Sequence, residues 1–246
     1  LSSDWSSDVC SSDLFDPYCF PSTRLYVYTK EGLFMKNNTI ITISRQYGSG
    51  GREIGKRLAE KLGIPFYDKE LITLAAQQSG YSEHLFEKTD KGATNSLLYS
   101  LSMYGNTMGL YDMPLNDKLF IAQSQTIKNV AEQGSCVIVG RCADYVLRGH
   151  PHVLNVFIHS DMESKVKRVI EEYGVESDDV VDLINKTDKR RANYYNYYTG
   201  MKWGRAENYH LALRTDCVGI EGAVETLIQF VEAKNALEDA EKAAAK

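Results

Sequence analysis

The sequence predicts an α/β fold in which helices cover a mostly parallel β-sheet. Short β-branched runs alternate with helical patterns along the chain, which is the order expected of strand–helix–strand units. A cluster of glycines follows the first of these runs. With 246 residues, of which 43% are hydrophobic and 25% charged, the chain is long enough to bury a core without disulfides or metals. This length fits one large domain or two small ones.

Composition and charge argue against several classes of protein. Uninterrupted apolar runs reach only about five residues, where a membrane-spanning helix needs roughly twenty. The 28 basic and 33 acidic residues give a net charge of −5, so we expect no broad contact with nucleic acid, although a local basic cluster could bind a small phosphate compound. The five cysteines are scattered and form no C-x-x-C pair, which favours a reducing cytoplasm over a disulfide framework or a zinc site.

The first 34 residues differ in composition from the rest. They contain three Ser-Ser-Asp triplets, and no methionine precedes Met35. A secretory signal would need a basic start and a continuous apolar stretch, whereas the first basic residue is Arg24. Two interpretations remain: translated adaptor or vector sequence joined to an open reading frame, or a disordered arm. We expect residues 1–34 to lie outside a single folded domain that spans residues 35–246.

Within that domain, periodicity predicts each element in turn. A buried strand over residues 39–44 ends in the glycine cluster, and the next helix places Ile54, Leu58 and Leu62 on one face before it ends at Gly63. A short strand at 66–67 leads into a helix over 68–78. Residues 92–114 carry glycines and little periodicity, which predicts a mobile insertion.

The remaining elements alternate in the same way. The pattern predicts a helix over 115–133, strands at 136–139 and 153–159, a helix after Ser160, a helix from Ser177 into the basic, tyrosine-rich stretch 186–198, a strand at 209–214, a final helix and a charged tail from Ala236. The helix after Ser160 is predicted to begin with a capping box from Ser160 to Glu163. Its predicted buried face consists of Met162, Val166, Val169, Ile170 and Tyr173.

The glycine cluster predicts a phosphate site. A strand, the loop 47–53 and a helix form an arrangement in which backbone N–H groups converge on an anion at the helix N-terminus. The dinucleotide fingerprint G-x-G-x-x-G, started at Gly48, would need glycine at position 53, where Glu53 stands. This argues against a dinucleotide oxidoreductase. A tight turn without a ligand remains an alternative.

A P-loop, G-x-x-x-x-G-K-[ST], fits the context better, although three of its positions differ. Alignment on the following helix assigns Arg45 to the first glycine, Gly50 to the second, Gly51 to the lysine and Glu53 to the hydroxyl that binds Mg²⁺. The glycine backbone would still cradle phosphate, because it depends on conformational freedom and not on a side chain. The missing positive charge must come from elsewhere, and Arg45, Arg52 and Lys56 are the local candidates.

Four segments together resemble the cytidylate kinase-like family. They are IITISRQYGSGGREIGKRLAEKLG at 40–63, FYDKELI at 66–72, VGR at 139–141 and DKRRANYY at 188–195, and the resemblance covers nearly everything after Met35. It implies a P-loop NTPase three-layer fold with a parallel five-stranded sheet. It also implies a helical insertion that binds the nucleoside monophosphate, at about residues 68–114, and a lid at about residues 177–205 that closes over ATP.

The resemblance also implies roles for individual residues. The loop that binds the ATP phosphates corresponds to Gly48, Ser49, Gly50, Gly51, Arg52 and Glu53, with Arg45 before it. Asp68 matches the acidic residue that begins the monophosphate-binding segment, and Arg141 matches the acceptor-binding arginine. The lid contains Lys189, Arg190 and Arg191. The chain departs from true cytidylate kinases at the Gly-Arg pair. Val139 and Cys142 stand where those enzymes keep acidic residues, Asp144 is the nearest acid, and Tyr194 occupies a later lid arginine position.

These residues suit phosphoryl transfer, which needs positioning and neutralisation of phosphate oxygens. Guanidinium forks bind two oxygens at once, so Arg52, Lys189, Arg190 and Arg191 are the candidate catalytic cations and Arg141 the acceptor clamp. A basic helix turn is alternatively a solvated face. Glu53 could bind Mg²⁺ directly or repel the phosphates. Asp68 could instead be a helix N-cap, and the tyrosines 194, 195, 197 and 198 either stack on a base or pack the lid.

We therefore expect ATP- and Mg²⁺-dependent phosphoryl transfer to a small-molecule nucleotide, with CMP or dCMP as the acceptor that the resemblance implies. A nucleotide-binding regulatory protein that has lost turnover is an alternative of another class, which Gly51 and Glu53 favour. A kinase for a non-nucleotide small molecule is a third, because one fold serves many acceptors.

Overall fold

The computed structural model describes residues 39–86, 114–176 and 179–244. Within them, five strands form one sheet in the order β2-β3-β1-β4-β5, and every neighbouring pair is parallel. The strands are β1 (Ile40–Arg45), β2 (Phe66–Tyr67), β3 (Cys136–Val139), β4 (Val153–His159) and β5 (Leu211–Arg214). The expected N-terminal segment and nearly all of the expected mobile insertion, residues 92–114, lie outside the described residues.

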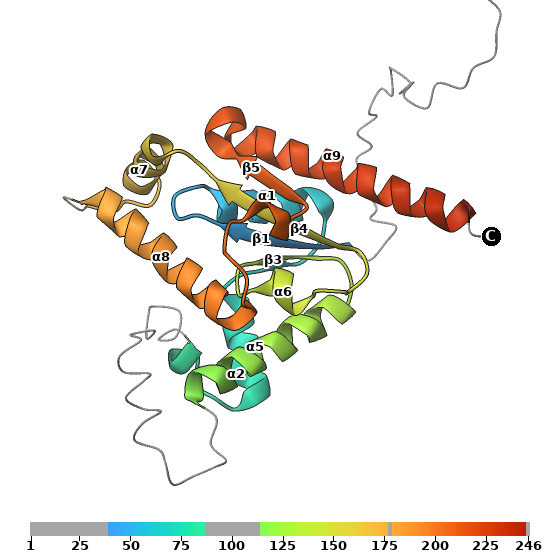
Figure 1. Cartoon of the computed structure of the whole chain (residues 1–246), viewed down its shortest axis with the longest axis horizontal. Coiled ribbons are helices and arrows are strands. Elements are labelled where there is room, and N and C mark those ends of the chain that lie inside the picture. The colour runs from blue at the N-terminus through green and yellow to red at the C-terminus, as the bar shows by residue number, and fades with distance from the viewer. Residues whose placement is uncertain (1–38, 87–113, 177–178, 245–246) are drawn as a thin grey trace, which may run out of the picture. The chain divides into compact units, whose positions relative to one another are not determined.

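Helices cover both faces of the sheet, as Figure 1 shows. One face carries α1 (Gly51–Leu62) and α9 (Thr215–Ala244), and the other carries α2 (Glu70–Ser79), α5 (Leu115–Glu132) and α6 (Ala143–Val146). Helices α7 (Met162–Glu171) and α8 (Val180–Thr199) pack against each other, and a short 3₁₀ turn, η1 (Ala206–Asn208), precedes β5. This is the predicted three-layer α/β arrangement, and α8 lies within the expected lid range.

Strand β1 is buried on both faces because it is the central strand. Ile41 and Ile43 pack into the layer formed with α1 and α9, whereas Ile40 packs toward α5. Ile41 lies opposite Val137 on β3 and Leu154 on β4. Strands that are covered on both faces have continuous apolar sequences, which is why these strands are recognisable in the sequence. Their shared direction brings their carboxyl ends to one edge, where open α/β sheets bind ligands.

Helix α7 differs from its prediction at its start and on its buried face. The N-cap is Asp161, whose side chain accepts a hydrogen bond from Ser164 N at 2.8 Å. Ser160 instead donates to Asp216. Both residues are good caps, so the sequence could not decide between them.

The predicted buried face of α7 is also partly wrong. Val169 is fully buried as predicted, but Ile170 and Tyr173 are 49% and 43% exposed. Lys165, one turn before Val169, is only 5% exposed. It is buried because its ammonium group meets polar partners on the glycine loop and on α8, a pairing that hydrophobic periodicity cannot reveal.

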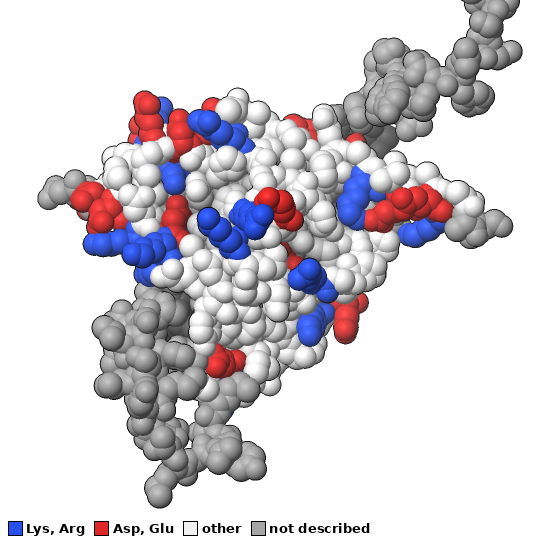
Figure 2. All heavy atoms as spheres, in the orientation of Figure 1, with Lys and Arg blue, Asp and Glu red and all other residues white. Residues whose placement is uncertain are grey.

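Helix α9 is interrupted at Gly219, whose backbone is non-helical, and then continues through the predicted tail to Ala244. Among the described helices, none is both long enough and apolar enough to cross a membrane. On the face drawn in Figure 2, the basic and acidic side chains of the described residues lie in small mixed groups. Five arginines also line a cleft at the carboxyl edge of the sheet.

Candidate active site

A cleft of about 850 Å³ opens beside the carboxyl ends of β1 and β3. It draws residues from the strand ends, from α1, α2 and α8, and from the turn after β3. Its charged lining consists of six basic residues, Arg45, Arg52, Lys69, Arg141, Arg190 and Arg191, and three acidic ones, Glu53, Asp68 and Glu83. The basic excess, on a chain with a net charge of −5, makes the cleft suited to a small polyanion.

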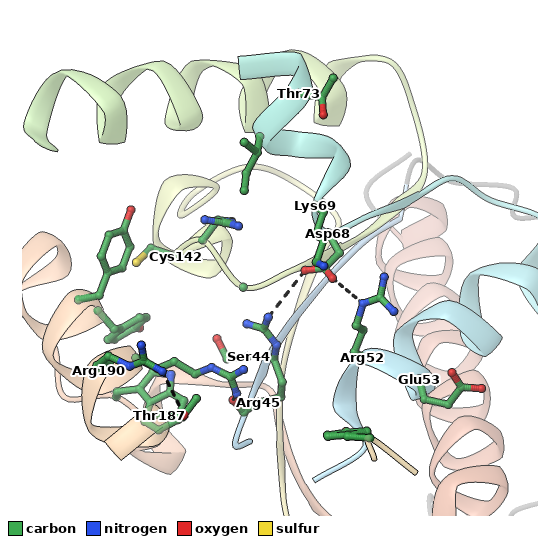
Figure 3. Close-up of a pocket in the computed structure, with 18 of the residues that line it drawn as sticks. Ser44, Arg45, Arg52, Glu53, Asp68, Lys69, Thr73, Cys142, Thr187 and Arg190 are labelled. Atoms are coloured by element: carbon green, nitrogen blue, oxygen red, sulfur yellow. Dashed lines mark hydrogen bonds and ion pairs between the residues drawn. The ribbon is translucent and has the colours of Figure 1, made fainter. Parts of the chain in front are cut away.

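Asp68 binds two of these arginines. Arg52 Nε donates to Asp68 Oδ2 at 2.6 Å, and Arg45 Nη2 lies 3.7 Å from Oδ1. Figure 3 shows both guanidinium groups reaching toward this carboxylate. The hydrogen bond to Asp68 raises the pKa of Arg52. Asp68 is not the N-cap of α2, because that position is Lys69.

The turn after β3 carries Arg141 in an unusual backbone conformation. Arg141 and Cys142 both have positive φ, at 61° and 55°, which is rare for two consecutive non-glycine residues. Gly140 before them has no side chain, and a Cβ there would lie 2.3 Å from Arg45 Nη1. The bare backbone at Gly140 therefore leaves the space that the Arg45 guanidinium occupies beside Arg141.

Asp144 follows this turn but does not line the cleft. Its carboxylate is 6% exposed and accepts a hydrogen bond from the Tyr195 hydroxyl at 2.7 Å. Burial raises the pKa of Asp144, against the lowering effect of that hydrogen bond. The acid nearest to Arg141 in the sequence is therefore buried and does not contribute to the charged lining of the cleft.

Helix α8 places its two arginines differently from Lys189. Arg190 and Arg191 line the cleft, where Arg190 donates to Thr187 Oγ1 at 3.2 Å and Arg191 donates to the Arg45 carbonyl oxygen at 2.9 Å. Lys189 is exposed and is absent from the lining. Of the three predicted lid cations, two therefore face the cleft.

The tyrosines of α8 divide in the same way. Tyr194 and Tyr195 both line the cleft, although Tyr195 is only 3% exposed. Tyr198 stacks on Phe120 of α5 with ring centroids 4.1 Å apart. Tyr197 is 52% exposed. Packing thus accounts for Tyr198, whereas Tyr194 and Tyr195 both contribute to the lining of the cleft.

The glycine loop lies behind the cleft. Gly48, Ser49, Gly50 and Gly51 are buried and absent from the cleft lining. The loop carbonyls are held by two distant side chains, because Arg168 donates to Gly48 O and Thr215 donates to Ser49 O, each at 2.9 Å. The first turn of α1 does reach the cleft through Arg52 and Glu53. Its first N–H groups have no partner within the helix.

The structure explains why the lysine of the P-loop motif is missing. A Cβ at Gly51 would lie only 2.5 Å from Arg45 Cβ. No side chain fits there unless the backbone moves, so a lysine at this position is excluded. Arg45 occupies this space, and it extends from the end of β1 into the cleft.

A buried ion pair ties the loop to helices α7 and α8. Asp188 accepts from Tyr47 N at 2.6 Å, and Lys165 Nζ lies 3.3 Å from the other oxygen of Asp188. Lys165 also donates to the Gln46 side chain at 3.3 Å. Sequence reasoning missed Lys165, because its place in an otherwise apolar helix face is the only signal and its partners are distant in the chain.

Glu53 does not stand at the motif position to which the sequence alignment assigned it. With Gly51 at the lysine position, the next residue is Arg52, and Glu53 lies one residue beyond. Its Oε1 accepts from Arg57 Nε at 2.7 Å along the outside of α1, and Figure 3 shows Glu53 on the far side of Arg52 from Asp68. Among the described residues, no group of three or more candidate side chains could hold a metal ion.

The sequence profile of the cytidylate kinase-like family matches residues 40–217. The chain belongs to the cytidylate kinase-like family. A cytidylate kinase from Ignicoccus hospitalis is 23% identical to it over 189 residues, which cover 77% of this chain and 96% of that protein. The crystal structure of an uncharacterized protein from Eubacterium ventriosum is 30% identical, covers 79% of this chain and 98% of its own, and superimposes with a TM-score of 0.60.

Membership of the cytidylate kinase-like family and the observed sheet confirm the predicted fold class. The parallel five-stranded sheet, the glycine loop between β1 and α1 and the helices on both faces are those of a P-loop NTPase. Family and fold together support a kinase that binds a nucleotide. Neither specifies the acceptor, which has to be argued from the cleft.

Proposed function

We propose that this protein transfers a phosphoryl group from ATP to a nucleoside monophosphate, with CMP or dCMP as the acceptor that family membership favours. The observation that carries the proposal is the convergence of five arginines on one cleft at the carboxyl edge of the sheet. They come from β1, α1, α8 and the turn after β3. Structural arginines are usually dispersed and paired at the surface, whereas a cleft with excess guanidinium groups suits phosphate oxygens.

Each arginine has a place in such a reaction. Arg141 and Arg45 lie together at the ends of β3 and β1, where they would bind the phosphate of the acceptor. Arg190 and Arg191 enter from α8, and Arg52 from the first turn of α1, where they would neutralise the transferred group. Lys189, which is exposed, is better assigned to the surface of the lid. The ATP phosphates would meet the backbone N–H groups at the start of α1, where Arg52 and Glu53 reach the cleft.

The side chains fit a magnesium ion that is held mainly by ATP. Glu53 offers one carboxylate at the rim of the cleft, with Oε1 engaged by Arg57. Asp68 is engaged by two arginines. Mg²⁺ keeps several waters and commonly takes one or two carboxylates plus substrate phosphates. When bound, it would neutralise charge on the phosphates, and Glu53 is the residue of this chain that would contact it or its waters.

Two other functions each have an observation in their favour. The first is a nucleotide-binding regulatory protein without turnover, which is favoured because Gly51 leaves no space for the P-loop lysine. The second is a kinase for a non-nucleotide acceptor, which is favoured because Asp144 accepts a hydrogen bond from Tyr195 and does not line the cleft. The cleft itself favours turnover over regulation, since a sensor for ATP alone would not require Arg141, which we assign to the acceptor.

The test is an ADP-release assay over a panel of nucleoside monophosphates and small hydroxylated acids and sugars, run beside ATP-dependent thermal stabilisation. We expect stabilisation by Mg²⁺-ATP and ADP release that depends on a pyrimidine monophosphate. Stabilisation without acceptor-dependent ADP release would contradict the proposal and favour the regulatory protein. Release that depends only on a non-nucleotide would favour the third function.

A further inference from the structure

We infer that Asp144 and Tyr195 are positioning residues, whose buried hydrogen bond fixes the Arg141 turn against helix α8. The bond thereby holds Arg141, at the acceptor phosphate, in place relative to Arg191, at the transferred group. The inference rests on the proposed function, because it concerns the same cleft. It adds Asp144, which does not line the cleft, and Tyr195, which lines the cleft but donates its hydroxyl to Asp144. The sequence predicts for Tyr195 only that it stacks on a base or packs the lid, and identifies Asp144 only as the acid nearest to the Gly-Arg pair.

The bond joins two elements that are distant in the chain. Tyr195 comes from α8 and Asp144 from α6, 51 positions apart, and the hydroxyl donates to the carboxylate at 2.7 Å. Tyr195 is 3% exposed and Asp144 6%. In such surroundings a hydrogen bond to a carboxylate is strong, and either group is costly to leave without the other.

On the Asp144 side, the bond supports a turn that would otherwise relax. Arg141 and Cys142 are both in the left-handed region, and such conformations persist only where the surrounding structure holds them. Backbone bonds from Ala143 N to Gly140 O and from Val146 N to Cys142 O close the turn onto α6. The side-chain hydrogen bond between Asp144 and Tyr195 attaches α6 to α8.

On the Tyr195 side, the same bond sets the position of α8. Arg191 lies four residues before Tyr195, so both project from one face of the helix. Arg191 donates to the carbonyl oxygen of Arg45 at 2.9 Å, which links α8 to the end of β1. The hydroxyl of Tyr209 adjoins those of Tyr195 and Ser44, so β1 and the segment before β5 contact the same buried group.

A purely stabilising contact would not need a carboxylate at this position. Burying an ionisable group is expensive, and an apolar pair of the same size would stabilise the packing at less cost. A hydrogen bond with a defined direction instead fixes the relative placement of α6 and α8. That placement determines the separation of Arg141 and Arg191, and the alignment of the acceptor with the transferred group is sensitive to this separation.

The test compares Tyr195→Phe and Asp144→Asn with Tyr197→Phe, a control on the same helix whose ring is 52% exposed. For each protein we would measure the Kd of CMP, the Kd of Mg²⁺-ATP, and kcat and KM. We expect Tyr195→Phe to raise the Kd and KM for CMP about tenfold, as a displaced binding group does. The Kd for Mg²⁺-ATP should stay within about twofold, because the glycine loop is held by other residues.

Two further results would distinguish positioning from stabilisation. The double variant should bind CMP no more weakly than either single variant, since each single variant already removes the hydrogen bond between Asp144 and Tyr195. If Tyr195→Phe lowers the unfolding temperature but leaves the Kd of CMP unchanged, the inference is wrong. Tyr195→Phe alone decides this point if Asp144→Asn does not fold.

The inference and the proposed function can fail separately. If the wild-type protein does not phosphorylate any acceptor, the proposed function fails, and the same variants are then titrated with inorganic pyrophosphate as the anionic probe. Weaker pyrophosphate binding by Tyr195→Phe than by Tyr197→Phe would still support the positioning role. Equal binding by the two variants, or no binding by the wild-type protein, would overturn it.

Discussion

Arg52 Nε donates to Asp68 Oδ2 at 2.6 Å across the mouth of the candidate active site. The two residues belong to different elements, since Arg52 lies in the first turn of α1 and Asp68 follows β2. The Asp68 side chain is 7% exposed, while that of Arg52 is 54% exposed. A buried carboxylate thus holds a more exposed guanidinium in place beside the cleft, together with Arg45.

We predict that Asp68→Asn weakens catalysis far more than stability. The neutral amide cannot hold both Arg45 and Arg52, so kcat/KM for the acceptor should fall about ten- to a hundredfold, in line with the loss of positioned groups. The unfolding temperature should change little, because Arg52 is largely in water. Glu60→Gln, which removes an exposed carboxylate on α1, is the matched control. An equal loss in both variants would refute a role for Asp68.

Gly51→Ala should destabilise the protein although alanine is the better helix former. The added Cβ would lie 2.5 Å from Arg45 Cβ, and the resulting overpacking should cost about 1–3 kcal/mol. That cost exceeds the gain of about 1 kcal/mol from helix propensity. Urea unfolding of the variant measures the difference. A stability equal to or above that of the wild-type protein would show that the loop has room for a side chain, and with it for the lysine.

Lys165→Met should lower the free energy of unfolding by about 3 kcal/mol, because it leaves Asp188 partly buried without its cation. The side chains of Lys165 and Asp188 are 6% and 15% exposed. Lys186→Met is the control, since the Lys186–Asp182 pair has 74% and 45% exposed side chains, and we expect no measurable change from it. Denaturant titrations that give the same value for both variants would contradict the structural importance of this pair.

Stability should fall as the pH is lowered through the titration of His210. Its Nδ1 accepts a hydrogen bond from Asn155 N at 2.8 Å, which requires the neutral ring. Burial of the ring, with a smaller contribution from Lys234, lowers the pKa of His210 below 6.5. A lowered histidine pKa means that this stability is present above the unfolded pKa and is lost as the pH falls through the folded one.

The measurement for this prediction is the unfolding temperature between about pH 8 and about pH 5, across the range in which histidines titrate. His210→Asn should show a flatter dependence, because an amide oxygen can accept the same bond at every pH in this range. His159, whose pKa is also lowered by burial, should account for part of the slope that remains. Superimposable curves for the variant and the wild-type protein would rule out His210 as a contributor.

The sequence was sufficient for the strands but not for the contacts between distant elements. Strand β3 occurs at Cys136–Val139 as predicted, and β1 is offset from its prediction by one residue at each end, because buried parallel strands have an apolar pattern and abrupt ends. The strand, the glycine loop and the helix also indicated a phosphate site. Side-chain partners were beyond reach, since Asp144 meets Tyr195 across 51 positions and Lys165 meets Gln46 across 119. No local pattern encodes such pairs.

The arginines of the site were predicted to different degrees. Arg141 and Arg191 were found because they lie in segments that resemble a known family, and both line the cleft. Lys189 shares the segment 188–195 with Arg191 but projects elsewhere, because neighbouring helix residues are about 100° apart around the helix axis. Which residues of a basic run face a cleft depends on how the helix is rotated, and that is set by tertiary packing such as the Asp144–Tyr195 bond.

The central claim is that the cleft binds an acceptor phosphate through Arg141 while ATP supplies the transferred group. The most direct measurement is chromatographic detection of CDP after incubation with ATP, Mg²⁺ and CMP, for the wild-type protein, Arg141→Ala and the control Arg148→Ala, which changes an exposed arginine in the following loop. We predict CDP from the wild-type protein and from Arg148→Ala, and at least about a hundredfold less from Arg141→Ala. Equal CDP formation by Arg141→Ala, or none by the wild-type protein, would contradict the claim.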